Sequence, residues 1–381
     1  MLANLLALFA SKLAPTVSEK VMTRVYNFSA GPAMLPQSIL EQARDELLDY
    51  GASGMSVMEI NHRGGQFAAL ANRSRDSLRR LMAVPDNYKI LFLHGPARTH
   101  FAAVPLNLAG AGAVADYVDT GLWSKMAMEE AESLLKVNVV ASSRAQDYTC
   151  IPALSEWCLG DDSAYVHFAP NETIGGVEFH DVPDLGDRVL VADMSSTILS
   201  RPIDVAKFGL IYAGAQKNMG IAGLTVVIVR EDLLGKARPG TPSMLDYRVH
   251  AEADSLACTA PTFAWYLAAL VFDWIDAQGG LEHMATINRR KADKLYACID
   301  SSNFYHNPIK ADCRSWMNVP FTLPSDDLDE IFLRESAEQG MVGLKGHRFV
   351  GGMRASIYNA MPEEGVDKLT TFMSDFMQRH G

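Results

Sequence analysis

Cysteine is scarce in this sequence, and its spacing does not suggest a structural role. The five cysteines are odd in number and include no Cys-x-x-Cys pair: Cys150, Cys158, Cys258, Cys298 and Cys313. Neither a disulfide framework nor a zinc site is therefore indicated, and we expect no bound metal. Because disulfide-stabilised proteins occupy oxidising compartments, this composition predicts a reducing, cytoplasmic setting.

An excess of positive charge is also missing. Lysine and arginine together number 34 against 45 aspartates and glutamates, which gives a formal net charge of −11. Such a chain has no global attraction for nucleic acid or for an anionic membrane surface. We therefore expect neither as a partner, and any anion must be bound by a local cluster of cations.

The sequence contains no apolar run of membrane-spanning length. Residues 1–24 carry leucines at helical spacing, but this stretch is too short to cross a bilayer and has no basic leader of a secretory signal. We expect an N-terminal extension without a catalytic part, because the patterned sequence begins at Val25.

What the sequence does contain is a regular alternation of strand and helix patterns. Hydrophobic residues make up 48% of its 381 residues, enough for a large core and two domains. Strands are expected at 88–93, 114–118, 164–168, 189–192, 210–213 and 224–229, and helices at 37–50, from near 65, at 101–108 and at 124–135. This alternation predicts an α/β fold whose mostly parallel sheet is covered on both faces.

Lys217 lies on a tight turn between the last two of these strands. A lysine desolvated there has a lowered pKa, and its neutral amine can attack a carbonyl to form a Schiff base. The alternative is a lysine that reaches solvent at the turn. Arg98, Trp123, Thr173 and Asp193 also follow directly on predicted strands. In parallel sheets, ligands bind at this edge.

Pyridoxal phosphate chemistry requires this combination of side chains. A lysine holds the cofactor, a carboxylate such as Asp193 keeps the pyridinium nitrogen protonated, and an aromatic ring such as Trp123 stacks on the cofactor ring. A helix cap is the alternative for Asp193, and a core indole is the alternative for Trp123. The loop 95–99 precedes a predicted helix and can supply donors to the cofactor phosphate.

Six separated motifs resemble the phosphoserine aminotransferase family, which belongs to class V of the fold-type I pyridoxal phosphate enzymes. They are NFSAGPAMLP, PNETIGG, ADMSSTILSRPIDV, YAGAQKN, APTFAWY and GHRFVGGMRASIYNAM, and the resemblance extends from about Tyr26 to Gly381. It implies a large cofactor domain at 37–278. A smaller α+β domain would combine the loop 25–36 with residues 279–381.

The resemblance also implies roles for individual residues. Lys217 would be the Schiff-base lysine, Asp193 the partner of the pyridinium nitrogen, Trp123 the stacking ring and Thr173 a contact to the cofactor ring. The cofactor phosphate would be bound by Ala97, Arg98 and Gln216, and by Cys258 and Thr259 from a partner subunit. The active form would therefore be a homodimer.

The implied substrates are L-glutamate and 3-phosphohydroxypyruvate, which would give 2-oxoglutarate and O-phospho-L-serine in serine biosynthesis. Ser29 and Arg354 match carboxylate-binding positions; His62, Arg63, His347 and Arg348 match the group that binds the substrate phosphate or the distal carboxylate of glutamate. Whether the phosphorylated hydroxythreonine precursor of vitamin B6 is a second substrate stays open.

Two departures from the family pattern keep an alternative open. The usual GGxRGQ is GPARTH at 95–100, and the usual Asn-Thr is Cys258-Thr259. Pro96 brings no N–H group, and Cys258 removes an amide donor. A non-catalytic binding protein without cofactor is therefore one rival interpretation. Another class V activity, of the alanine–glyoxylate aminotransferase or cysteine desulfurase type, is the second, and the four cationic residues argue against it.

Overall fold

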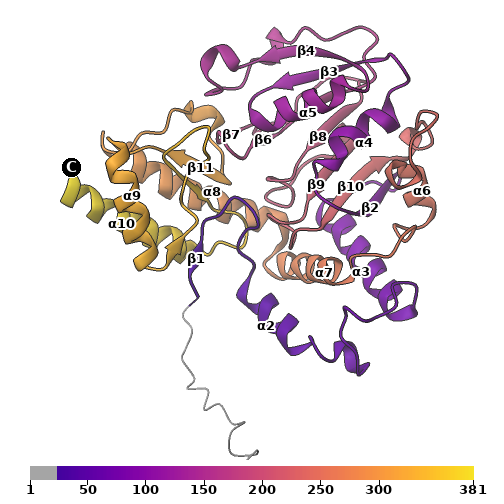
Figure 1. The fold of residues 1–381 in the computed structure, drawn as a ribbon, viewed down its shortest axis with the longest axis horizontal. Coiled ribbons are helices and arrows are strands. Elements are labelled where there is room, and N and C mark those ends of the chain that lie inside the picture. The colour runs from indigo at the N-terminus through magenta and orange to yellow at the C-terminus, as the bar shows by residue number, and fades with distance from the viewer. Residues whose placement is uncertain (1–23) are drawn as a thin grey trace, which may run out of the picture.

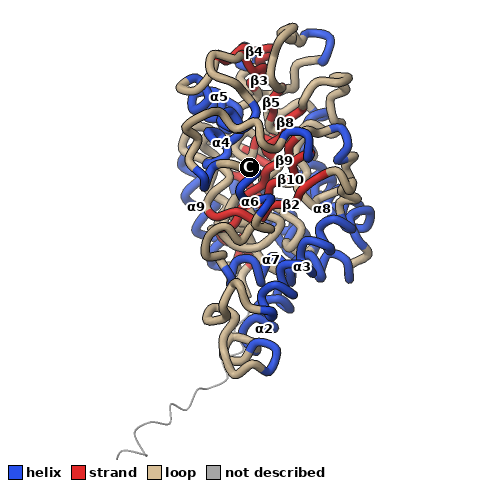
Figure 2. The backbone as a smooth tube through the Cα atoms, turned by 90° about the vertical axis from the view of Figure 1, so that its right-hand side faces the viewer, coloured by secondary structure: helices blue, strands red, loops and turns tan. Residues whose placement is uncertain are grey.

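The computed structural model describes residues 24–381, and its centre is a seven-stranded sheet (Figure 1). The strands are β2 (Tyr88–His94), β3 (Val114–Asp119), β4 (Lys136–Ser142), β5 (Val166–Phe168), β8 (Leu190–Asp193), β9 (Leu210–Gly214) and β10 (Leu224–Arg230). Their order in the sheet is β2-β10-β9-β8-β5-β3-β4, which Figure 2 shows running from β4 at the top to β2. Only β10 is antiparallel to its neighbours, so the predicted mostly parallel sheet is confirmed.

Strand β4 was not predicted, because it lies at the edge of the sheet and pairs with β3 alone. Its residues are mostly half-buried or exposed, so the apolar pattern that marks the inner strands is weak here. The six strands that were predicted are all present.

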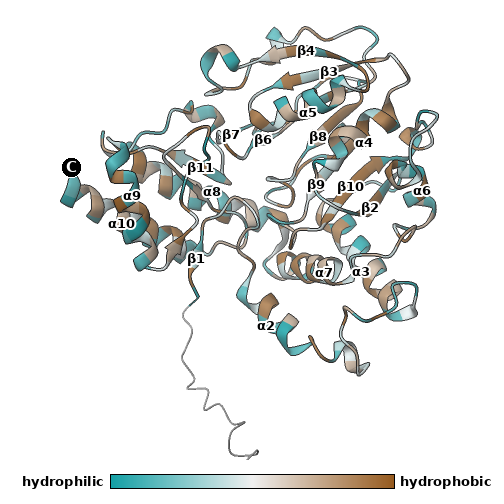
Figure 3. Ribbon diagram, viewed as in Figure 1, coloured by the Kyte–Doolittle hydropathy of each residue, from teal (hydrophilic) through white to brown (hydrophobic). Residues whose placement is uncertain are grey.

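Helices cover both faces of the sheet. On one face, α3 (Gly65–Leu81) and α7 (Thr262–Ala277) share a core with Val226 and Ile228 of β10; on the other, α4 (Thr99–Leu108), α5 (Leu122–Glu132) and α6 (Tyr247–Glu252) share a core with Val227 and Val229. Successive residues of a strand point to opposite faces, which explains why β10 is apolar throughout. Figure 3 shows this hydrophobic character along the inner strands and α7.

The predicted helix at 37–50 is shorter in the structure. It ends as α2 (Gln37–Asp45), and a 3-10 turn at Tyr50–Ala52 follows, with Gly51 at a φ of 59°. A positive φ does not occur within an α-helix, so the chain turns here.

A third core belongs to the C-terminal part of the chain. It combines α8 (Gly280–Asp300), α9 (Asp326–Glu338) and α10 (Glu363–His380) with the pair β11 (Asn318–Phe321) and β13 (Met353–Ser356). Strand β1 (Tyr26–Asn27) pairs with β12 (Met341–Val342), and Phe28 lies in this core. The N-terminal loop therefore packs with the C-terminal residues, although the proposed domain boundaries stay a prediction.

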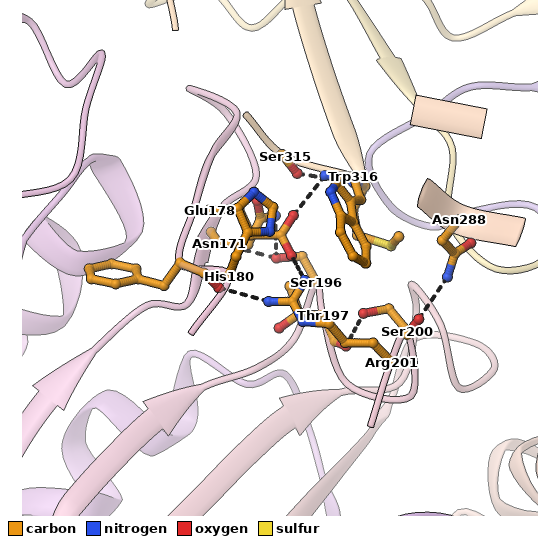
Figure 4. Close-up of polar contacts among 12 residues, drawn as sticks. Asn171, Glu178, His180, Ser196, Thr197, Ser200, Arg201, Asn288, Ser315 and Trp316 are labelled. Carbon is orange, nitrogen blue, oxygen red and sulfur yellow. Dashed lines mark hydrogen bonds and ion pairs between the residues drawn. The ribbon is translucent and has the colours of Figure 1, made fainter. Parts of the chain in front are cut away.

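A hairpin of β6 (Asn171–Glu172) and β7 (Val177–Glu178) connects the two parts (Figure 4). Glu178 is fully buried, forms an ion pair with Arg201 and accepts a hydrogen bond of 2.7 Å from the backbone N–H of Trp316. The Asn171 amide donates to Ser196 Oγ at 2.8 Å and to Asn318 Oδ1 at 2.9 Å. These contacts hold the sheet edge against β11.

The described residues include no helix with the length and hydropathy of a membrane span. Within residues 24–381, no three histidines, cysteines or carboxylates gather as metal ligands would. All five cysteines are free. The predicted N-terminal extension lies outside the described residues, except for Arg24.

Candidate active site

The carboxyl ends of the parallel strands surround a cavity of about 240 Å³. Seven predicted site residues line it: Ala97, Arg98, Trp123, Thr173, Asp193, Gln216 and Lys217. They come from the segments that follow β2, β3, β5, β8 and β9, so the sheet topology accounts for their meeting. Two adjoining side chains that were not predicted, Asn171 and Ser196, also line the cavity.

Lys217 is buried at the floor of the site, with 8% of its surface exposed. Its Nζ donates to Thr173 Oγ1 at 2.6 Å. Burial lowers the pKa of Lys217 to about 8; the nearby Asp193 carboxylate raises the pKa, and the charge of Arg354 lowers it. The side chain therefore does not reach solvent, and a neutral amine is accessible close to neutral pH.

The N-terminal loop closes over Lys217. The backbone N–H of Ala33 donates to the Gln216 carbonyl at 2.9 Å, and a methyl group on Gly31 would lie 3.6 Å from Lys217 Cγ. This contact explains why NFSAGPAMLP and YAGAQKN, far apart in the sequence, belong to one site.

Asp193 ends β8 with one carboxylate oxygen engaged and one available. Its Oδ1 accepts from the backbone N–H of Ser195 at 3.0 Å and from Ser195 Oγ at 2.6 Å, whereas Oδ2 accepts no hydrogen bond from another described residue. Burial raises the pKa of Asp193, while the donors on Ser195 and the charge of Lys217 lower it. The carboxylate thus caps a turn, as the alternative interpretation held, and still offers an acceptor to the cavity.

Trp123 lies at the start of α5 and presents its ring to Lys217. The ring centre is 5.7 Å from Lys217 Nζ, and the indole Nε1 is buried without a described hydrogen-bond partner. The side chain is only partly buried and lines the cavity, unlike an indole of the core. Its backbone N–H donates to Glu172 Oε2 at 2.9 Å, a contact that sequence reasoning did not identify.

The loop before α4 keeps donors for a phosphate despite Pro96. Gly95 has a φ of 92°, Arg98 is helical at φ −57° and ψ −28°, and the Pro96 carbonyl accepts from the N–H of Thr99 at 3.0 Å. The N–H groups of Ala97 and Arg98 donate to no carbonyl of the described residues. A helix N-terminus with unpaired N–H groups attracts a phosphate.

Cys258 and Thr259 do not line the Lys217 cavity. They border a separate space of about 430 Å³ together with His94, Thr99 and His100 of the same chain, and His94 contacts the carbonyl of Thr259. Their predicted role was in the site of a partner subunit, so a single chain does not test it.

Among the predicted substrate residues, Arg354 of β13 lies near the cavity. Its charge lowers the pKa of both Lys217 and His347, and its Nε is buried without a described partner. Arg348 follows His347 and is exposed, with its guanidinium 4.9 Å from the centre of the Phe349 ring. Ser29 lies in the N-terminal loop, where its N–H donates to Asn27 Oδ1 at 3.0 Å.

His62 and Arg63 precede α3, and no described hydrogen bond or ion pair joins them to the residues around Arg354. Arg63 is exposed, whereas His62 Nε2 is buried without a described partner. A single chain therefore does not bring the four predicted phosphate-binding residues into contact.

This fold and this site define a class-V aminotransferase. The family model described as aminotransferase class-V matches residues 25–369. At the finer level, the chain belongs to the phosphoserine aminotransferase family. It is 60% identical to the phosphoserine aminotransferase of Hahella chejuensis (strain KCTC 2396) over 94% of this chain and 99% of that protein.

Solved structures agree with this assignment. The phosphoserine aminotransferase of Bacillus circulans subsp. alkalophilus superposes with a TM-score of 0.92 at 47% identity, covering 94% of this chain and 99% of that one. The pyridoxal phosphate-bound phosphoserine aminotransferase of Trichomonas vaginalis has a TM-score of 0.89 at 42% identity, covering 92% and 100%.

The described residues fit pyridoxal phosphate. The amine of Lys217 is buried, and Asp193 offers an unpartnered carboxylate oxygen to the same cavity. Trp123 lines this cavity, and Ala97 and Arg98 offer backbone N–H groups for a phosphate. These are the groups that an aldehyde, a pyridinium nitrogen, an aromatic ring and a phosphate require.

Proposed function

We propose that this protein is a phosphoserine aminotransferase that moves the amino group of L-glutamate to 3-phosphohydroxypyruvate, producing 2-oxoglutarate and O-phospho-L-serine. The observation that carries the proposal is the buried Lys217, 2.6 Å from Thr173 and in one cavity with Asp193 and Trp123. Bound pyridoxal phosphate supplies the electron sink for this chemistry.

Each residue of the cavity has a defined task in this proposal. Lys217 would hold the cofactor and, once the substrate amine has displaced it, its free Nζ would move the proton of the substrate Cα, because its lowered pKa makes a neutral amine available. Asp193 Oδ2, which accepts no hydrogen bond from a described residue, would accept one from the protonated ring nitrogen. Thr173 positions Lys217 Nζ and would contact the cofactor ring, on which Trp123 would stack.

The residues proposed to bind the substrates are mostly cationic, although the chain as a whole carries a net negative charge. Arg354, with Ser29, receives the substrate carboxylate, and its buried, unpartnered Nε supports this role. His347 and Arg348, with His62 and Arg63, receive the phosphate of one substrate and the distal carboxylate of the other. Neutral substrates of other class V enzymes do not require so many charged donors.

The proposal includes a homodimer. Cys258 and Thr259 complete the cofactor phosphate site of the partner subunit, which is consistent with their distance from the Lys217 cavity in one chain. A second copy also offers a way to bring His62 and Arg63 to the remaining phosphate-binding residues. Serine biosynthesis in the cytoplasm belongs to the same proposal, whereas a second reaction in pyridoxine biosynthesis stays an open question.

The decisive experiment follows the absorbance of the purified protein with bound pyridoxal phosphate. Glutamate should shift the visible band, and 3-phosphohydroxypyruvate should restore it, whereas hydroxypyruvate without the phosphate should restore it poorly. A protein that never acquires the band would be a binding protein. A band restored equally by both acceptors would indicate another class V aminotransferase.

A further inference from the structure

Glu172 is a fully buried carboxylate to which neither the family resemblance nor the proposed reaction gives a task. It lies on β6, directly before Thr173, and points away from Glu178 of the same hairpin. Glu178 contacts Arg201 and Trp316, as Figure 4 shows. Glu172 instead contacts the start of α5.

Both oxygens of Glu172 accept hydrogen bonds from the first turn of α5. Oε2 accepts the backbone N–H of Trp123 at 2.9 Å, and Oε1 accepts the backbone N–H of Ser124 at 2.8 Å and Ser124 Oγ at 2.8 Å. These contacts to a buried carboxylate restrain the backbone at Trp123 and Ser124.

The backbone N–H groups of Trp123 and Ser124, at the start of α5, have Glu172 as their acceptor. Ser124 Oγ accepts the N–H groups of Thr120 and Gly121, each at 3.0 Å, and its one proton has two acceptors within reach, Glu172 Oε1 at 2.8 Å and the Gly121 carbonyl at 3.0 Å. Burial raises the pKa of Glu172, whereas the donors on Ser124 and Trp123 lower it. An ionised carboxylate at the N-terminus of an 11-residue helix is also favoured by the helix dipole.

Gly121 leaves the space that Glu172 occupies. A Cβ added at Gly121 would lie 2.6 Å from Glu172 Cδ, closer than non-bonded carbon atoms approach one another. The Gly-Leu-Trp sequence after β3 and Glu172 at the end of β6 are therefore complementary parts of one contact.

We propose that Glu172 is the positioning residue of the cofactor ring: it anchors the backbone of Trp123 so that the indole faces Lys217, while the adjacent Thr173, in the turn of the same hairpin, holds Lys217 Nζ. The two sides of the ring site are thus connected to one rigid hairpin. This inference rests on the proposed function, because it assigns Trp123 to a bound cofactor.

Glu172→Gln isolates the Trp123 contact. The amide oxygen can still accept from Ser124, but the amide nitrogen then faces the N–H of Trp123, and two donors cannot pair. Gly121→Ala should have the same effect by displacing an unaltered carboxylate. Glu178→Gln is the matched control, because it changes the other buried carboxylate of the hairpin without touching α5.

Two measurements test the proposal. Hydrogen–deuterium exchange of the apoprotein should show the Trp123 amide exchanging roughly tenfold faster in Glu172→Gln and Gly121→Ala, since a charge-assisted hydrogen bond is lost. Titration with pyridoxal phosphate should show roughly threefold to tenfold weaker binding and reduced quenching of the Trp123 fluorescence, with Trp123→Phe identifying that signal. Glu178→Gln should match the parent in both.

Each other outcome overturns the inference. Unchanged exchange in both variants would show that the contact does not restrain α5. If exchange is faster but cofactor affinity and fluorescence quenching match the parent, Glu172 acts only as a helix cap. If Glu178→Gln shows the same effects, their cause is a general loss of stability. A parent that fails to bind pyridoxal phosphate, with exchange still accelerated in Glu172→Gln, would instead overturn the proposed function and with it this role.

Discussion

Lys217 and Asp193 are buried ionisable residues whose pKa values shift toward neutrality from opposite sides. Burial lowers the pKa of Lys217 to about 8 and raises that of Asp193. Each residue also favours the charged form of the other. The pair therefore combines a lysine that can lose its proton with a carboxylate that stays available for a cationic ring nitrogen.

The first prediction concerns the capture of cofactor by the apoprotein. The rate of reaction with pyridoxal phosphate should rise with pH with a midpoint at about pH 8, because the attacking species is the neutral amine of Lys217. Stopped-flow absorbance across this range measures it, and Lys217→Ala should show no covalent phase. A midpoint at the ordinary lysine pKa of about 10.4 would contradict the burial argument.

Asp193→Asn should leave the fold intact and lower kcat by roughly 10- to 100-fold, because a neutral amide cannot hold the proton of the ring nitrogen. The variant retains an oxygen that can accept from Ser195, so its melting temperature should stay close to that of the parent. Ser195→Ala is the counterpart, since it removes the hydroxyl donor but keeps the carboxylate. Near-parental turnover in Asp193→Asn would leave Asp193 with a capping role alone.

Arg63→Ala should lower kcat/KM for 3-phosphohydroxypyruvate by roughly 10- to 100-fold, because a charge-assisted hydrogen bond contributes about 1.5–3 kcal/mol. Arg63→Lys should recover only part of the loss, since an ammonium lacks the planar fork of the guanidinium. Cofactor affinity should not change. Arg44→Ala is the control, because Arg44 is an exposed arginine of α2 with 71% of its side chain accessible.

The outcome to compare is the preference for the phosphorylated acceptor over hydroxypyruvate. If Arg63→Ala kept the parental preference, the phosphate would have to be bound elsewhere.

At the scale of elements, α8 contacts the loop after β13 through one buried lysine. Lys291 Nζ donates to the carbonyls of Ile357 at 3.0 Å, Tyr358 at 2.8 Å and Met361 at 3.0 Å. The same loop directs Tyr358 toward the N-terminal loop, where its hydroxyl donates to the carbonyl of Ala30 at 2.8 Å. This lysine therefore connects a helix of the third core with the loop that carries Ser29.

Lys291→Met should destabilise the protein by roughly 2–4 kcal/mol, because it removes the donor of several buried carbonyls. Burial also lowers the pKa of Lys291 to about 7 from an ordinary value of 10.5. Between these values the unfolded chain holds a proton that the folded chain has lost, so this group makes stability rise with pH. The variant should lack that rise.

Chemical denaturation at several pH values measures both effects. Lys294→Met is the control on the same helix: Lys294 pairs with the partly exposed Glu363 and the exposed Asp367, and its loss should cost under about 1 kcal/mol. Equal losses of unfolding free energy in the two variants would mean that the buried hydrogen bonds of Lys291 contribute no more stability than the surface ion pairs of Lys294.

For the whole molecule, the prediction is a cofactor site shared between two subunits. Thr259→Ala and Lys217→Ala should each lower the activity of the homodimer. A mixed dimer with one chain of each variant should regain one complete site, in which Lys217 comes from the Thr259→Ala chain and the intact Thr259 comes from the Lys217→Ala chain. Subunit exchange followed by assay and sedimentation measures this. Activity that never rises on mixing, or a fully active monomer, would place Thr259 within its own chain's site.

Much of the site could be predicted from the sequence because it follows from local patterns. Apolar runs of strand length define β8, β9 and β10, and the alternation with helices makes the sheet mostly parallel. Parallel strands end at one edge, so Thr173 after β5, Asp193 at the end of β8 and Lys217 after β9 had to meet there. The edge strand β4 was missed because its half-exposed residues give a weak pattern.

Only the tertiary structure decided which partners these residues have. The sequence placed Glu172 beside Thr173 but did not show that it reaches the backbone of Trp123, 49 positions away. It also did not show that Lys291 is buried or that Arg354 lies near Lys217. Strand and helix patterns depend on neighbouring residues, whereas a buried charge depends on donors and acceptors from distant segments, and these meet only when the chain is folded.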